Sequence, residues 1–230
     1  GFDVNMYNVI QSGQKYNFEV KMLGPETGYV RLCGMPMGDN YKMAEELVRK
    51  ICYVQVDLPQ NWVLDLRYNG GVYLFPMAEA LVPLLGEGPA GGTDGILDAE
   101  DAVWKVNDEM FYYGDFTLAV PKMCLFSRLP KIAVLTSMYT TSSGEAIAVM
   151  FKGRNHTRFF GQKTLGMTTV TDWHPIDKNT TMSISVSYYK DRKGKVYTEY
   201  IEPDEYFPFE ENPLSENDQC LKRAMAWLKE

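Results

Sequence analysis

The chain has 230 residues, of which 45% are hydrophobic and 23% are charged, as in an ordinary soluble globular protein. This length is enough for one large domain or two small ones. The net charge of −7 and the absence of a Lys/Arg cluster argue against a nucleic-acid partner, whose phosphates require a basic patch. No apolar run approaches the roughly 18 to 20 residues that span a membrane.

The four cysteines are Cys33, Cys52, Cys124 and Cys220. They are widely spaced, form no Cys-x-x-Cys pair, and are accompanied by only two histidines, which argues against a zinc site. Their apolar surroundings favour buried free thiols. One disulfide is left open, because an extracytoplasmic location would permit it.

The first part of the chain predicts two strands and a helix. Residues 16–23 alternate in polarity and predict a strand, and residues 29–33 predict a second one after a Gly/Pro turn. A helix is expected to begin near Asp39 or Asn40, which are both good N-cap residues. Apolar residues then recur at helical spacing as far as Ile51.

Residues 62–66 form a short apolar run, which is typical of a strand buried on both faces. We expect a helix over residues 74–85. The glycine-rich residues 86–95 predict a loop. Beyond them the pattern is harder to interpret, and we expect a helix near 100–108 and a strand near 116–120.

Residues 131–136 predict a second buried strand, followed by a turn and an apolar helix that begins near Ala146. Further strands are expected from residue 157 and over residues 182–188. A final helix is expected to be capped by Ser215.

Buried strands that alternate with helices predict an α/β domain with a largely parallel central sheet. We expect residues 26–230 to form this domain. Residues 1–25 are expected to be the end of an upstream module or linker.

Residues 136–152 are the best candidate for chemistry. Ser142 falls at the predicted strand-to-helix turn, where unpaired backbone N–H groups stabilise negative charge and can hold an oxyanion. A serine hydroxyl needs a base to become a nucleophile. The alternative interpretation is structural, because Ser142 followed by Glu145 also matches a helix capping box.

A second glycine-bearing turn, Asp65 to Gly71, follows the other buried strand. Loops at the carboxyl ends of strands in an open α/β sheet form ligand sites, so the two turns are expected to meet. Glycines there would let a substrate approach the backbone closely. The alternative is an ordinary turn that needs a positive φ.

Four segments together resemble the motifs of the tail-specific, or C-terminal-processing, serine peptidases. Residues 64–71 (LDLRYNGG) look like the family's Asp-Leu-Arg-x-Asn-x-Gly-Gly motif, and residues 141–145 (TSSGE) are similar to its nucleophile motif. Residues 161–166 (GQKTLG) match its Gly-x-x-Thr-x-Gly strand, and residues 201–204 (IEPD) resemble its Ile-x-Pro-Asp segment. All four occur in the family's order.

The resemblance implies a Clp-protease/crotonase-like α/β core. It places Ser142 at the nucleophile position and assigns the oxyanion hole to the backbone N–H of Ser143 and that of Gly70 or Gly71. Val72 stands where the family's glycine stretch continues.

The catalytic base is where the chain departs from the family pattern. Met167 occupies the position at which many members carry a lysine base, and Lys163 is interpreted as a surface residue. The chain therefore resembles the tricorn-like branch, which uses a Ser–His–Ser–Glu tetrad, and Glu199 resembles the tetrad glutamate. His156 and His174 both follow Ser142, whereas that branch's histidine lies far upstream, so we expect the base to come from outside this chain.

The resemblance thus predicts a serine endopeptidase or C-terminal-processing peptidase that acts on peptides or proteins, with an upstream domain of the same protein completing the site. No metal or organic cofactor is implied. By analogy the location is extracytoplasmic, either periplasmic or on the cell surface. The alternative is a catalytically inactive peptide- or ligand-binding module on the same fold. An acyl-CoA enzyme of the crotonase type is disfavoured by the four motifs.

Overall fold

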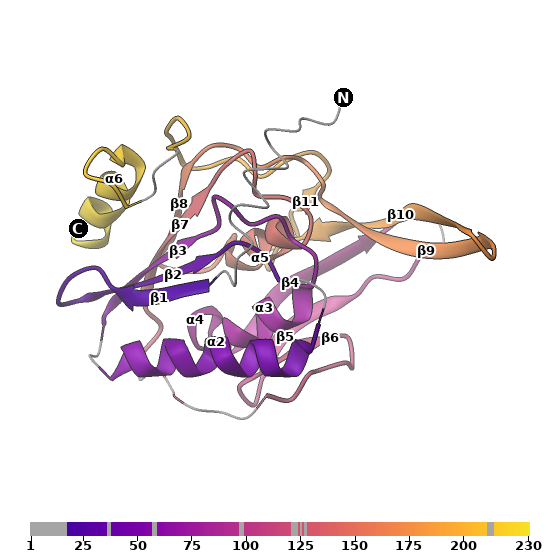
Figure 1. The fold of residues 1–230 in the computed structure, drawn as a ribbon, viewed down its shortest axis with the longest axis horizontal. Helices are drawn as coiled ribbons and strands as arrows, with labels where there is room; N and C mark the ends of the chain where they lie inside the picture. Colours follow the sequence, from indigo (N-terminus) through magenta and orange to yellow (C-terminus); the bar gives the residue numbers. More distant parts are fainter. Residues whose placement is uncertain are drawn as a thin grey trace.

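A central sheet of six strands holds the chain's buried apolar runs (Figure 1). The computed structural model describes residues 18–35, 38–56, 59–96, 99–120, 124, 126, 128–210 and 214–230. In spatial order the strands are β1 (Phe18–Met22), β2 (Thr27–Leu32), β3 (Asn61–Asp65), β7 (Lys131–Thr136), β8 (Thr157–Gly161) and β12 (Glu205–Tyr206).

Only the pair β1–β2 in this sheet is antiparallel, and the other four pairs are parallel. The predicted α/β class with a largely parallel sheet is therefore confirmed. The boundary expected at residue 25 does not separate β1 from this sheet, because Phe18 pairs with Leu32 and Met22 with Gly28.

Helices cover both faces of the sheet. On one face lie α2 (Asn40–Gln55), α3 (Leu74–Ala80), α4 (Val82–Leu85) and α5 (Ser143–Phe151), and on the other lies α6 (Gln219–Leu228). Successive side chains of a strand point to opposite faces. Accordingly, Trp62 and Leu64 pack in the larger core, whereas Val63 packs beneath α6. None of the helices in the described part of the chain is long and apolar enough to cross a membrane.

The helix ends follow capping chemistry. Asp39 caps α2 by accepting the Lys42 N–H at 3.0 Å, as expected. The expected helix over 74–85 is interrupted at Leu81, where α3 ends and α4 begins with Pro83 in its first turn. The expected Ser215 cap is wrong, because Asp218 caps α6 by accepting the Leu221 N–H.

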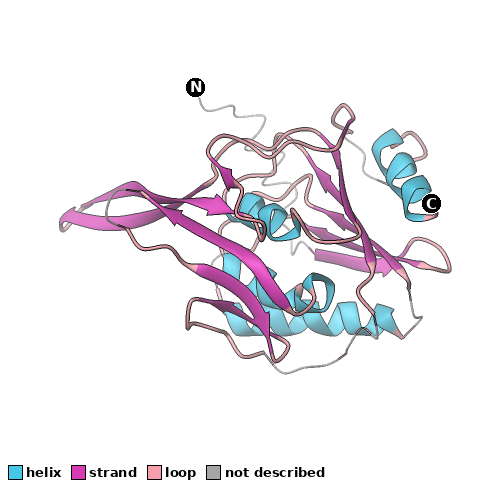
Figure 2. Ribbon diagram, turned by 180° about the vertical axis from the view of Figure 1, so that it is seen from behind, coloured by secondary structure: helices cyan, strands magenta, loops and turns pink. Residues whose placement is uncertain are grey.

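A second, antiparallel sheet lies beside the helices. Its strands are β11 (Val196–Tyr197), β10 (Thr180–Lys190), β4 (Gly88–Gly95), β5 (Val103–Asn107) and β6 (Met110–Tyr113), and β9 (Thr169–Asp177) pairs with β10. Figure 2 shows that β9 and the first part of β10 form a ribbon that extends away from the body.

The expected loop over 86–95 and the expected helix near 100–108 are both wrong. Close packing requires glycine at two positions inside β4, since a Cβ on Gly92 would lie 2.3 Å from the Ala102 carbonyl oxygen and one on Gly91 would lie 2.6 Å from that of Lys190. Strand β5 alternates between exposed and buried residues, with Trp104 and Val106 in the core. The described residues 116–120 contain no strand.

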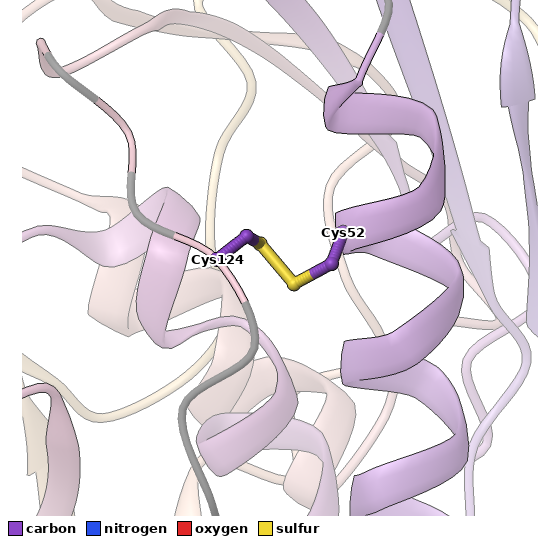
Figure 3. Close-up of a disulfide and its surroundings, with 2 residues drawn as sticks. All are labelled: Cys52 and Cys124. Atoms are coloured by element: carbon purple, nitrogen blue, oxygen red, sulfur yellow. A yellow bond between two sulfur atoms is a disulfide. The ribbon is translucent and has the colours of Figure 1, made fainter.

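A disulfide joins helix α2 to Cys124, which is distant in the sequence. Cys52 on α2 is bonded to Cys124, with a Cα–Cα distance of 5.4 Å (Figure 3). Cys33 and Cys220 are free and buried. The expectation of free thiols is therefore confirmed for two cysteines and wrong for the other two.

Replacing Cys52 and Cys124 together by serine is expected to destabilise the protein. The bond closes a segment of 72 residues, and loss of that constraint on the unfolded chain corresponds to about 4 kcal/mol in the chain-entropy model. Urea unfolding of the double variant, and of the parent with a reducing agent, measures this difference. An unchanged midpoint in both experiments would contradict it.

Glu79 on α3 is buried and accepts the backbone N–H of Phe111 at 3.0 Å. Burial raises the pKa of its carboxyl to about 7, although backbone hydrogen bonds from Phe111 and Val120 oppose the shift. The folded state therefore retains a proton on Glu79 at pH values where the unfolded chain has released it.

The free energy of unfolding is expected to fall as the pH rises from the ordinary glutamate pKa to about 7, because the folded state binds more protons over this interval. Glu79→Gln removes the titration, so its stability should change less over the same interval. Chemical denaturation at several pH values compares the two proteins. Equal slopes would rule out Glu79 as the source.

Candidate active site

Two turns from neighbouring parallel strands meet at the carboxyl edge of the central sheet. The turn after β3 and the turn after β7 are joined by hydrogen bonds from Thr140 Oγ1 to the Leu66 carbonyl at 2.8 Å and from the Thr141 N–H to the Asn69 carbonyl at 2.9 Å. Ser143 Oγ donates to the Val72 carbonyl at 2.9 Å. The expected meeting of the two turns is thus observed.

Ser142 lies at this junction in a strained conformation. It is the N-cap of α5, with φ 54° and ψ −124°, outside the regions that non-glycine residues ordinarily adopt. Such strain persists only where the surrounding structure enforces it, and it concentrates at functional sites. A serine on a sharp strand-to-helix turn has its hydroxyl presented at the edge of the sheet, as a nucleophile requires.

The buried carboxylate of Glu145 holds this turn through hydrogen bonds. Its Oε2 accepts the Ser142 N–H at 3.0 Å and the Met167 N–H at 2.8 Å. Its Oε1 accepts Thr164 Oγ1 at 2.6 Å and the Gly166 N–H at 2.8 Å. Burial raises the pKa of this carboxyl, while these hydrogen bonds lower it.

Glu145 therefore has two structural roles. It is the capping-box partner of Ser142 that the sequence allowed as an alternative, and it also ties the loop 164–167 to the start of α5. The second role was missed, because it depends on a loop about twenty residues away that the spacing Ser-x-x-Glu does not reveal.

A buried ion cluster fixes the other turn. Arg67 donates to both carboxylate oxygens of Asp65, at 3.0 and 2.7 Å, and Nη1 donates to Asp218, at 2.9 Å to Oδ2. All three side chains are almost fully buried. Tyr29 donates its hydroxyl to Asp65 at 2.9 Å. Arg67 holds the pKa of the Asp65 carboxyl below its usual value despite burial.

The backbone donors at the site are not equally available. The Gly70 N–H donates to the Cys33 carbonyl at 3.0 Å, and the Gly71 N–H donates to Asn69 Oδ1 at 2.9 Å. Within the described residues, the N–H groups of Ser143 and Val72 have no acceptor. The N–H groups of both glycines that were expected to act as oxyanion donors are thus engaged. The Gly71 backbone still lies close to Ser143, since a Cβ on Gly71 would be 2.9 Å from the Ser143 nitrogen.

Glu199 lies beside the loop that Glu145 binds. A Cβ on Gly166 would lie 2.7 Å from the Glu199 carbonyl oxygen. The Glu199 side chain is exposed, and no described residue forms an ion pair or hydrogen bond with its carboxylate. The backbone of Glu199 therefore lies beside residues 164–167, the loop that Glu145 joins to the Ser142 turn. Its carboxylate is free.

Among the described residues, no histidine or lysine forms a hydrogen bond with the Ser142 side chain. His156 is exposed just before β8, at the amino edge of the sheet, and His174 is exposed on the ribbon. Met167, at the position where the motif resemblance would place a lysine base, has no basic group, and Lys163 Nζ lies over the Tyr200 ring at 3.9 Å. No group of three or more His, Cys, Asp or Glu residues in the described ranges is arranged to hold a metal ion.

Comparison with known proteins matches residues 26–207 to the model of Peptidase family S41. The chain is 31% identical over 170 residues to the nisin-resistance protein of Lactococcus lactis subsp. lactis. The aligned region covers 73% of the chain and 49% of that protein. The chain thus spans about half the length of this relative.

Two solved structures share the fold. A lipoprotein from Streptococcus agalactiae superposes with a TM-score of 0.73 and 18% identity, over 97% of this chain and 74% of that one. The photosystem II D1 C-terminal processing protease gives a TM-score of 0.56 and 19% identity, over 86% and 46%. The fold is accordingly the Clp-protease-like α/β core that the sequence motifs implied. The match to the family model over most of the chain establishes that the chain belongs to Peptidase family S41.

Proposed function

We propose that the protein is a serine peptidase in which Ser142 attacks the carbonyl of a peptide bond. The observation that carries this proposal is the strained backbone of Ser142 at the start of α5, held by Glu145 and by the turn after β3. The reaction is acyl transfer to water: the Ser142 oxygen bonds to the carbonyl carbon, the amine leaves with a proton, and water releases the acyl group.

The tetrahedral oxyanion is held by backbone N–H groups. The Ser143 N–H, which has no acceptor within the described chain, is the first donor. The second comes from the Gly70–Val72 turn, where the Val72 N–H is the one without an internal acceptor among the described residues. Donors fixed before the reaction stabilise the developing charge without a cost of reorganisation.

The general base comes from a part of the protein outside this chain. A histidine supplied there takes the Ser142 proton. In a Ser–His–Ser–Glu tetrad this histidine is oriented by a second serine hydroxyl and a glutamate, and the free carboxylate of Glu199 is that glutamate. The chain's coverage of about half of the nisin-resistance protein is compatible with a site completed by other residues.

Substrates are peptides or proteins, as membership of a peptidase family implies. Because one relative is a nisin-resistance protein, nisin belongs in the panel of test peptides. The similarity to a lipoprotein and the Cys52–Cys124 disulfide both support an extracytoplasmic location.

A fluorophosphonate probe is expected to label Ser142 in the full-length protein. Ser142→Ala should abolish labelling, and the 230-residue chain alone should label weakly because its base is missing. Gel fluorescence measures the labelling, with circular dichroism as the control for folding. Absence of label from folded full-length protein would contradict a peptidase and favour the alternative of a peptide-binding module.

Gly71→Ala is expected to disrupt the site specifically. Gly71 has φ 81°, and an added Cβ would meet the Thr141 carbonyl oxygen at 2.8 Å and the Ser143 nitrogen at 2.9 Å. Gly194→Ala is the matched control, since Gly194 has φ 84° but no atom within 4 Å of the added Cβ.

Both alanine variants should lose on the order of 1 kcal/mol of stability through the positive φ. In the full-length protein, only Gly71→Ala should also lose fluorophosphonate labelling. Only at that position does the added Cβ push the turn after β3 away from the turn that carries Ser142. Equal labelling of the two variants would contradict the role given to the Gly70–Val72 turn.

A further inference from the structure

The ribbon of β9 and β10 extends beyond the body of the molecule (Figures 1 and 2). It carries large exposed apolar side chains. Trp173 is 68% exposed, Met182 44% and Ile184 40%. Within the described ranges, β9 pairs with β10 alone, and β10 pairs with β4 only from Ser187 onward. No further strand of the described chain covers this part of the ribbon, so its apolar surface gains from being covered.

The strand register divides these side chains between two faces. Cross-strand partners share a face, and the partners here are Val170 with Ser187, Asp172 with Ile184, and His174 with Met182. These six residues form what we call the pocket face. Trp173 pairs with Ser183 and lies on the opposite face. Two of the large apolar residues, Met182 and Ile184, therefore lie on one face together.

The pocket face continues into a cavity of about 630 Å³ at the base of the ribbon. Its lining includes Val170 and Ser187 of the ribbon, and its charged residues are Glu100, Asp101, Asp115 and Lys105. Apolar residues of the lining, among them Val103 and Val186, suit an apolar side chain. Asp101 is paired with Lys190 at 2.6 Å, which leaves the carboxylates of Glu100 and Asp115 against the single lining cation of Lys105, so the surface favours a positively charged ligand.

The root of the ribbon is linked to the nucleophile by hydrogen bonds. Tyr189 of β10 donates its N–H to the Thr168 carbonyl at 3.0 Å. The adjacent Met167 N–H donates to Glu145, which also accepts the Ser142 N–H. Strand β9 begins at Thr169, so His174 lies about 17 Å from the start of the strand at ~3.3 Å per residue.

We propose that the pocket face is an exosite that binds an extended, apolar and positively charged stretch of the peptide substrate while the scissile bond lies at Ser142. The occupant is the substrate itself, because the base of the ribbon is joined by hydrogen bonds to the Ser142 turn and the surface carries the complementary charge. This inference rests on the proposed function only in naming the bound peptide as a substrate. Only a peptide long enough to extend from Ser142 along the ribbon would contact both surfaces.

Fluorescence anisotropy on the 230-residue chain tests the exosite without requiring catalysis. The probe is a labelled peptide of about 16 leucine, alanine and lysine residues, long enough to span the ribbon at ~3.3 Å per residue. It is compared with a peptide of about one third that length, and with a long version in which glutamate replaces lysine. The long basic peptide should bind most tightly.

The double variant Met182→Ser with Ile184→Ser should weaken binding of the long basic peptide by about tenfold, through lost apolar burial. Binding of the short peptide should not change. Trp173→Ser is the matched control, since it removes a larger exposed side chain from the opposite face and should leave binding unchanged. Circular dichroism verifies that each variant is folded.

The inference is overturned if the long peptide does not bind the parent chain, if the double variant binds it as the parent does, or if Trp173→Ser weakens binding equally. Fluorophosphonate labelling of the same variants in the full-length protein separates the two proposals. Failure of Ser142 to label while peptide binding persists would refute the peptidase and leave the exosite as a peptide-binding surface.

Discussion

The strained backbone of Ser142 is the constraint on which the site depends. A residue with φ 54° cannot continue either the preceding strand or the following helix, so it must be held from several sides. Glu145 holds it from within its own helix, and Ser143 anchors the first turn of α5 to the Val72 carbonyl. The close approach of Gly71 to Thr141 and Ser143 leaves no room for a side chain, so glycine at this position is part of the same restraint.

The turn after β3 is in turn fixed from the far side of the sheet. Arg67 joins Asp65, at the end of the strand, to Asp218, the cap of α6. A buried ion pair of this kind contributes little net stability compared with apolar packing, but removing one partner leaves an uncompensated charge. We interpret the cluster as a device that fixes position: it sets the path of residues 66–72 and so the place where Gly71 meets Ser142. The C-terminal helix thereby contributes to the geometry of a site that it does not touch.

The sequence predicted the parts of this arrangement that depend on local pattern. The apolar runs of β3 and β7 and the glycine and serine turns after them were recognisable, as were the residues gathered at the carboxyl edge. Glycine-rich β4 was misinterpreted because composition cannot distinguish a flexible loop from a strand whose neighbours exclude a Cβ. The link from Glu145 to residues 164–167, the Arg67–Asp218 pair and the engagement of the Gly70 and Gly71 N–H groups all depend on contacts between distant segments. No spacing rule anticipates such contacts.

The central claim, that Ser142 is a nucleophile with Ser143 as an oxyanion donor, is tested most directly by a crystal structure of the full-length protein with a peptide boronic acid. The account predicts a covalent bond from Ser142 Oγ to boron and a boronate oxygen within about 3 Å of the Ser143 nitrogen, the distance of an oxyanion-hole hydrogen bond. A boronate bonded to another residue, or bound with its oxygens turned away from Ser143, would contradict it.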